Sequence, residues 1–135
     1  MTIAQLTQRA LRVKALFDET AKKTGRHPWT RAELAQGFTG DVGALMKLVM
    51  AKEGRRPTKI ENIEAALEHE LADCLWSVLV LAANYDIDLE AAYDRMMSEL
   101  EGKLSPPRRT KTARTSRARR RSPAPKSRTG QPKGS

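Results

Sequence analysis

The sequence predicts an all-α fold, a bundle of four helices. Apolar residues recur at three- and four-residue steps in four separate stretches, which is the period of amphipathic helices. Glycine, proline and helix-capping residues fall between these stretches, where helices end and begin. The third stretch is almost wholly apolar in its second half, which indicates that this half is buried against more than one neighbour.

The first predicted helix covers residues 3–23, and Gly25 is expected to end it. A second helix should cover about residues 31–52, because Thr30 and Glu33 match the Thr-x-x-Glu capping box that opens helices. The apolar face of the first helix consists of Ile3, Leu6, Ala10, Val13, Leu16 and Phe17.

Three glycines, Gly37, Gly40 and Gly43, lie inside the second predicted helix. Each costs up to about 1 kcal/mol relative to alanine, so something must offset them. Close approach of a neighbouring helix is the favoured explanation, since small residues let two backbones come near each other. The alternative is that the glycines leave room for a ligand beside Asp41.

Gly54 and Pro57 break the chain before a third helix, predicted over about residues 60–84. Asp88 is a suitable N-cap for the fourth helix, and Gly102 lies at its end. The apolar band of the third helix is Ile63, Leu67, Leu71, Cys74, Leu75, Val78 and Leu81, and the inner face of the fourth is Leu89, Ala92, Tyr93, Met96 and Leu100.

The second half of the third helix also predicts self-association. Its apolar side chains, Trp76, Val78, Leu79 and Val80, point in more directions than one small bundle can cover. We therefore expect a homodimer or a higher homo-oligomer.

The basic charge is concentrated at the C-terminal end of the chain. Residues 105–135 hold eleven of the 25 Lys and Arg and no Asp or Glu, which leaves 14 basic against 16 acidic groups in residues 1–104. The tail also has no apolar residue larger than alanine, so it cannot offset the entropy of ordering. We expect a folded domain over residues 1–104 and a disordered Arg/Lys/Ser/Pro-rich tail over residues 105–135.

The single cysteine, Cys74, excludes an intrachain disulfide and is typical of a reducing compartment. No stretch has the roughly 18 consecutive apolar residues that would cross a bilayer, and the N-terminus lacks the apolar core of a secretory signal. These observations predict a cytoplasmic protein with no membrane partner.

A pair of acids in the third helix is the strongest chemical signal. Glu70 and Asp73 are three residues apart, so they lie about 60° apart around the helix and can address one cation. Asp41 on the second helix can face them, as in metal sites assembled between the helices of a bundle. The alternative is an ordinary solvated helix face, on which Glu-x-x-Asp pairs are common.

The segment Gly40-Asp41-Val42-Gly43-Ala44-Leu45, followed by His69-Glu70-Leu71-Ala72-Asp73-Cys74-Leu75-Trp76, resembles the MazG-like nucleoside triphosphate pyrophosphohydrolases. Their signature is Glu-x-x-Glu, a spacer, then Glu-x-x-Asp. The resemblance implies an all-α bundle that dimerises or forms larger oligomers. It also implies Mg²⁺-dependent cleavage, with Mn²⁺ as a substitute, of a nucleoside triphosphate to a monophosphate and pyrophosphate.

The resemblance further implies roles for individual residues. Asp41, Glu70 and Asp73 match the metal ligands, while Ala44 stands where the family has the second acid of its first motif. No catalytic base is assigned. The candidate substrate contacts are Lys47 and Arg95 for phosphate and Trp29 near the base.

Two other functions compete with this hydrolase activity. Because Ala44 removes one expected acid, the chain could be a MazG-like protein of reduced activity, or one that binds metal or nucleotide without turnover. Alternatively, Arg117-Ala118-Arg119-Arg120-Arg121 could give the tail non-specific contacts to nucleic acid phosphates. A solvated charge run explains the tail equally well.

Overall fold

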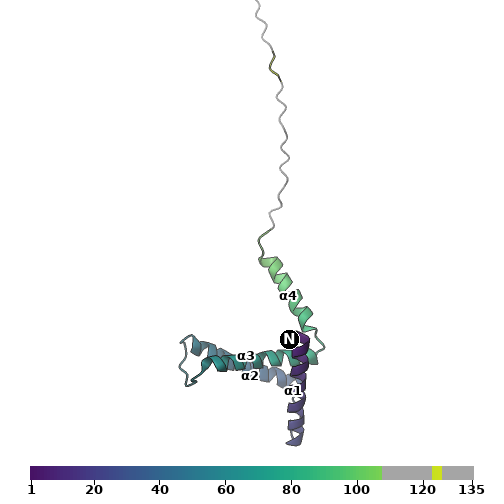
Figure 1. Cartoon of the computed structure of the whole chain (residues 1–135), viewed down its shortest axis with the longest axis vertical. Helices are drawn as coiled ribbons and strands as arrows, with labels where there is room; N and C mark the ends of the chain where they lie inside the picture. Colours follow the sequence, from purple (N-terminus) through teal and green to yellow (C-terminus); the bar gives the residue numbers. More distant parts are fainter. Residues whose placement is uncertain (108–122, 126–135) are drawn as a thin grey trace, which may run out of the picture. The chain divides into compact units, whose positions relative to one another are not determined.

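The chain is all-α, as the sequence predicts. Four helices follow one another, with no strand among the described residues: α1 (Ile3–Lys23), α2 (Arg31–Lys52), α3 (Ile63–Asn84) and α4 (Leu89–Leu104) (Figure 1). The computed structural model describes residues 1–107 and 123–125, so the disorder and nucleic-acid binding expected of the tail fall mostly outside the described residues. No helix in the described part of the chain has both the length and the apolar composition needed to cross a bilayer.

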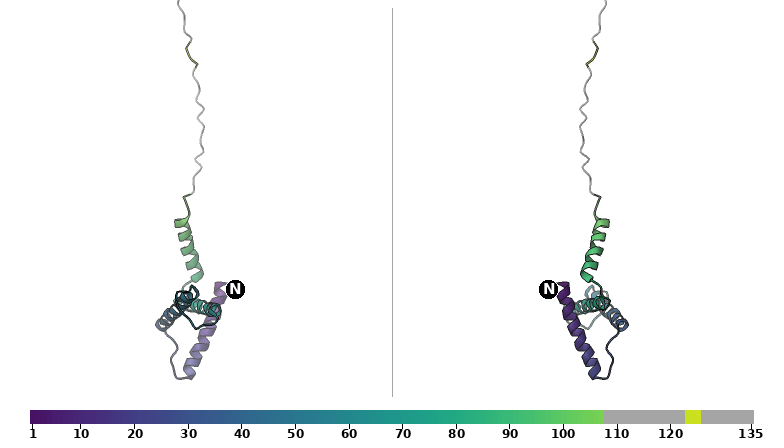
Figure 2. Two further views of the ribbon diagram at one scale, coloured as in Figure 1. Left: turned by 90° about the vertical axis from the view of Figure 1, so that its left-hand side faces the viewer. Right: turned by 90° about the vertical axis from the view of Figure 1, so that its right-hand side faces the viewer.

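Helix α3 is the element that both other long helices contact. It runs antiparallel beside α2, and α1 crosses it near its C-terminal half (Figures 1 and 2). Ala10, Leu34, Leu79 and Val80 form the buried core at this crossing. The indole Nε1 of Trp76 donates a hydrogen bond to the Ala10 carbonyl at 3.2 Å, which ties α3 to α1.

The helix starts follow local capping chemistry. The capping box predicted at Thr30 and Glu33 is present: the Thr30 hydroxyl accepts from the Glu33 N–H at 3.2 Å, and Glu33 Oε2 accepts from the Thr30 N–H at 2.8 Å. The predicted start of the third helix near residue 60 was three residues too early. Asn62 caps α3, its Oδ1 accepting from the Ala65 N–H at 3.0 Å, so the helix begins at Ile63.

The favoured explanation of the three helix glycines was wrong for the described chain. A Cβ on Gly40 or Gly43 would meet nothing within 4 Å, so no helix in the described part of the same chain requires glycine at either position. A Cβ on Gly37 would lie 2.7 Å from Cζ3 of Trp29. Gly37 therefore makes room for an aromatic ring, which comes from the loop before α2 rather than from another helix.

Several predicted inner faces are exposed. Among the described residues, α4 has no buried side chain, and Tyr93, Met96 and Leu100 are exposed although Leu89 packs against the core. In the predicted band of α3, Leu71 and Leu75 are exposed. The remaining exposed members of the predicted faces are Val13, Leu16 and Phe17 on α1.

The second half of α3 is buried, but mostly by its own chain. Leu79 is 3 % exposed and Val80 is completely buried, and both belong to the core that α1 and α2 share. They were therefore the wrong residues from which to infer self-association, because one subunit already covers them.

Candidate active site

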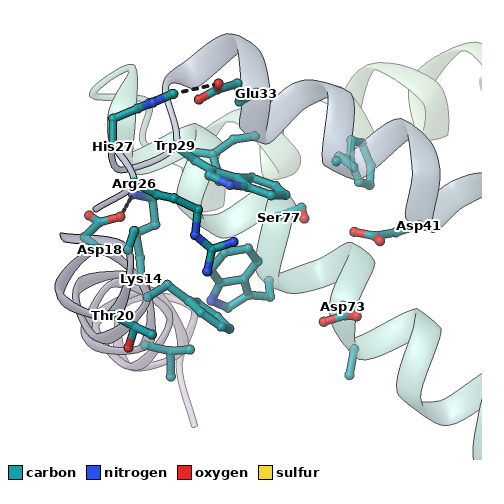
Figure 3. Close-up of a pocket in the computed structure, with 18 of the residues that line it drawn as sticks. Lys14, Asp18, Thr20, Arg26, His27, Trp29, Glu33, Asp41, Asp73 and Ser77 are labelled. Carbon is teal, nitrogen blue, oxygen red and sulfur yellow. Dashed lines mark hydrogen bonds and ion pairs between the residues drawn. The ribbon is translucent and has the colours of Figure 1, made fainter. Parts of the chain in front are cut away.

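A cavity of about 810 Å³ lies between α1, α2 and α3 (Figure 3). Contacts divide the chain after Leu104, and all residues around this cavity belong to the unit Met1–Leu104. The volume falls in the range of pockets that hold a small-molecule ligand such as a nucleotide. Its aromatic lining consists of Phe17, Trp29, Phe38 and Trp76.

Two tryptophans give the middle of the cavity its shape. Trp29 is held against α2 where Gly37 leaves space for its ring. Trp76 comes from α3 and is fixed by its hydrogen bond to Ala10 and by an edge-to-face contact with Phe17, with ring centroids 5.9 Å apart. Planar apolar surfaces of this kind suit a heterocyclic base.

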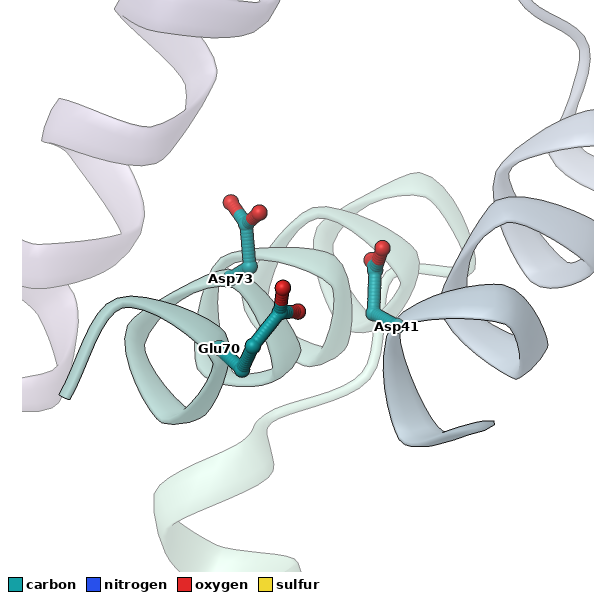
Figure 4. Close-up of side chains that lie close together, drawn as sticks. All are labelled: Asp41, Glu70 and Asp73. Carbon is teal, nitrogen blue, oxygen red and sulfur yellow. The ribbon is translucent and has the colours of Figure 1, made fainter. Parts of the chain in front are cut away.

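Three carboxylates meet where α2 and α3 face each other at one end of this cavity. Asp41, Glu70 and Asp73 each offer one oxygen, and these oxygens all lie within 4.8 Å of one another (Figure 4). The spacing of Glu70 and Asp73 puts both on one side of α3, and Asp41 reaches them from the middle of α2. Asp41 and Asp73 line the cavity itself.

The acid cluster carries little positive compensation. Among the described residues, one basic side chain lies within ion-pair distance of these acids, His69, whose Nε2 is 3.6 Å from Asp73 Oδ2. Asp41 and Glu70 are half-buried, and the side chain of Asp73 is 48 % exposed. The acid cluster also affects the neighbouring Cys74. Burial raises the pKa of the Cys74 thiol, and the negative charges of Asp41, Glu70 and Asp73 raise it further.

This donor set fits a hard divalent cation. Mg²⁺ prefers oxygen ligands and is usually held by a few carboxylates together with waters and substrate phosphates. Three carboxylates that share one small volume, open on one side to a ligand-sized cavity, meet that preference. Ala44, one turn along α2 from Asp41, is half-buried and contributes no ligand atom.

The wall opposite the acids carries basic side chains, some of them paired with acids. Lys14 on α1 and Arg26 in the loop after α1 line it, and in Figure 3 the side chain of Arg26 points into the cavity. Lys14 is paired with Asp18, four residues along the helix. The cavity therefore has an acidic end, an aromatic middle and an opposite wall that holds Arg26 and the Lys14–Asp18 pair.

The structure separates the three predicted substrate contacts. Trp29 lines the cavity, whereas Lys47 and Arg95 are exposed and lie outside the described residues that line it. Sequence reasoning missed Arg26, Lys14 and the wall position of Trp76. The sequence shows that Arg26 directly follows the helix-ending Gly25. The direction of the Arg26 side chain could not be predicted, because it depends on how α1 crosses α3.

The comparisons with known proteins agree with the geometry. The family model of the MazG nucleotide pyrophosphohydrolase domain matches residues 33–104, which contain all three acids. The chain is 36 % identical over 60 residues to a protein of Bacillus subtilis (strain 168) described as "Uncharacterized protein YpjD". That match covers 44 % of this chain and 54 % of YpjD, so the chain spans about half the length of the curated relative it matches. No solved structure matches the chain. With the signature acids inside a family match that covers more than half of its residues, the chain belongs to the MazG nucleotide pyrophosphohydrolase domain family.

Proposed function

We propose that this protein is a divalent-metal-dependent nucleoside triphosphate pyrophosphohydrolase. Water would add to the α-phosphorus while the bond to the bridging oxygen breaks, giving a nucleoside monophosphate and pyrophosphate. The observation that carries the proposal is the meeting of Asp41, Glu70 and Asp73 at the acidic end of a nucleotide-sized cavity. Family membership supports the same activity.

Residues in different parts of the cavity would have different roles. Asp41, Glu70 and Asp73 would hold Mg²⁺ or Mn²⁺ and so fix the triphosphate at the acidic end. The bound cation would neutralise phosphate charge and make a bound water more acidic. Trp29 and Trp76 would receive the base and exclude water from one side of the substrate.

Pyrophosphate release by the full chain tests the proposal directly. The protein is incubated with a panel of nucleoside triphosphates and Mg²⁺ or Mn²⁺, alongside the variants Asp73→Asn and Asp94→Asn. Asp94 is an exposed acid of α4 outside the cluster, so it controls for the loss of one negative charge. Asp73→Asn should lower pyrophosphate release by more than about a hundredfold, since even supporting residues of metal sites cost 10–100-fold.

A second readout separates metal binding from turnover. Mg²⁺ binds the native state, so it should raise the melting temperature of the wild type and of Asp94→Asn, and the shift should vanish in Asp73→Asn. Without metal, Asp73→Asn should melt no lower than the wild type, because one of three mutually repelling carboxylates is gone. An Asp73→Asn protein that loses its helicity would instead make the acids structural, and the proposal would fall.

Ala44 favours a second candidate, a MazG-domain protein that binds metal and nucleotide without turnover. The family resemblance expects a fourth acid there, and the structure brings together three. A metal-dependent rise in melting temperature together with no pyrophosphate release from any nucleotide would select this candidate.

We also propose the wider setting of the protein. The single cysteine favours the cytoplasm, and residues 1–104, which contain the whole cavity, form the active domain. The active form is proposed to be a homo-oligomer.

A further inference from the structure

Arg26 is a cation of the cavity wall that the hydrolytic chemistry does not use. It lies in the loop between α1 and α2, before the segment that matches the MazG domain. In Figure 3 its side chain extends into the cavity below Trp29, with Asp41 and Asp73 on the other side. Its position is therefore opposite the end that would hold the phosphates.

The end of α1 fixes where Arg26 starts. Gly25 has φ +73°, in the left-handed region that favours glycine, and this turn lets the Arg26 N–H donate to the Ala21 carbonyl at 2.8 Å. The Arg26 Nε–H donates to the Thr24 hydroxyl oxygen at 3.3 Å, and that hydroxyl lies 3.0 Å from the carbonyl oxygens of Thr20 and Ala21. Hydrogen bonds thus fix both the backbone N–H and the side-chain Nε–H of Arg26.

The other basic groups of the same wall already have partners. Lys14 is paired with Asp18, and His27 Nε2 lies 3.0 Å from Glu33 Oε1. No carboxylate of the described residues lies within ion-pair distance of Arg26. With Nε occupied by Thr24, the two terminal nitrogens of the guanidinium remain as a planar pair of donors toward the cavity.

The layout of the cavity determines which part of a bound nucleotide lies beside the two terminal nitrogens of Arg26. With the phosphates at the acids and the base in the aromatic middle, Arg26 would lie beside an edge of the base. Guanine and hypoxanthine present two neighbouring acceptors, O6 and N7, on their major-groove edge. On the same edge adenine presents only N7 as an acceptor, beside an amino group, and cytosine presents an amino group, so neither can accept two hydrogen bonds from arginine, which has no acceptor for the amino group.

We propose that Arg26 is a specificity-determining residue that selects 6-oxopurine nucleotides by donating two hydrogen bonds to O6 and N7. This inference rests on the proposed function for the placement of the phosphates. Thr24 acts as its positioning residue.

Calorimetric titration of the full chain tests this without requiring turnover. The ligands are the non-hydrolysable α,β-methylene analogues of GTP and ATP with Mg²⁺, and inorganic tripolyphosphate. The proteins are the wild type, Arg26→Ala, Arg26→Lys and Arg12→Ala. Arg12 is an exposed arginine of α1 outside the cavity lining, so its variant is the matched control.

The wild type and Arg12→Ala should bind the guanine analogue about tenfold or more tightly than the adenine analogue, the size expected of one bidentate arginine–guanine contact. Arg26→Ala should remove this preference by weakening only the guanine analogue. Arg26→Lys keeps the charge but lacks the planar fork, so it should lose the preference as well.

Three results of the binding titration would overturn the inference. The first is a wild type with no guanine preference or no binding of either analogue. The second is an unchanged preference in Arg26→Ala. The third is an equal loss for both analogues and for tripolyphosphate, which would make Arg26 a phosphate contact. A wild type that releases pyrophosphate from ATP and GTP equally would refute the inference and leave the proposed function standing.

Discussion

Ala44 is the single residue that most separates this site from a four-acid site. It is half-buried on α2, three residues after Asp41 and on the side that faces α3. Ala44→Glu should therefore add a fourth carboxylate to the cluster. Without metal, the new repulsion should cost about 0.5 kcal/mol, as for like charges at this spacing on a helix.

With Mg²⁺, Ala44→Glu should become the more stable of the two proteins. A fourth oxygen ligand tightens binding, so the metal-induced rise in melting temperature should be larger in Ala44→Glu than in the wild type, and pyrophosphate release should increase. Ala35→Glu is the control, because Ala35 is exposed on the same helix and lies outside the cavity lining. Equal metal affinity and turnover in all three proteins would count against a metal role for this face of α2.

At the residue scale, the sequence could place the three acids but not the wall opposite them. Glu70 and Asp73 share one helix, so their proximity follows from helical geometry alone. Asp41 joins them because α2 and α3 are consecutive helices that pack side by side, and elements consecutive in sequence are usually adjacent in space. Arg26 and Trp76 enter the cavity because α1 crosses α3, and no local pattern contains that crossing.

At the scale of the elements, α2 depends on its first turn to hold Asp41 and Trp29 in place. The capping box at Thr30 satisfies backbone N–H groups that the helix itself cannot. Thr30→Ala should destabilise the protein by about 1 kcal/mol, the usual cost of losing a threonine N-cap. The measurement is urea denaturation followed by circular dichroism at pH 7.

The other half of the capping box should make stability depend on pH. The Thr30 N–H and the His27 side chain bond the Glu33 carboxylate and hold its pKa below the ordinary value. A pKa lowered by folding contributes stability above the unfolded value, about 4.3 for glutamate, and the contribution disappears as pH falls through the folded pKa. Glu33→Gln should therefore be less stable than wild type at pH 7, and the difference should shrink as pH falls through the folded pKa of Glu33.

Glu99→Gln provides the comparison for that pH series. Glu99 is an exposed carboxylate of α4 outside any capping motif, so its variant controls for the removal of one surface carboxylate at each pH. A Glu33→Gln deficit that stays constant down to pH 3 would show that ionisation of Glu33 contributes nothing.

The helices themselves were the most predictable part of the fold. Capping boxes, glycine stops and the 3.6-residue period are local, and they placed α1 and α2 within their observed bounds. The glycines of α2 show the limit. Gly37 is explained by a ring eight residues earlier in the chain, and a spacing of three glycines could not distinguish that ring from a neighbouring helix.

At the scale of the whole molecule, one subunit leaves a continuous apolar surface uncovered. Val42, Met46 and Val49 recur along one row of α2, and Leu71 and Leu75 along one row of α3, and all five are exposed. On each helix the row lies one residue after the positions that face the other helix, which is a rotation of about 100° around the helix axis. Viewed from one end of the pair, two antiparallel helices wind in opposite directions, so these two rotations bring both rows to the same side of the α2–α3 pair.

This surface, rather than Val80, is where we expect a second copy of the chain to pack. Exposed apolar patches of this kind mark association surfaces in soluble proteins, and a symmetric dimer lets the same patch cover itself. Val80→Glu would put a charge into the core and unfold the subunit, so it cannot test association. Leu71 is 56 % exposed, so Leu71→Glu leaves the core intact while placing a charge in the proposed interface.

Sedimentation of the full chain at micromolar concentration should therefore show a dimer or larger species for the wild type and a shift toward monomer for Leu71→Glu, with unchanged helicity. Leu16→Glu is the matched control, because Leu16 is similarly exposed but lies on α1, away from this surface. It should sediment like the wild type. A monomeric wild type would refute the expectation outright, and equal dissociation by both variants would show that added charge, rather than this surface, governs association.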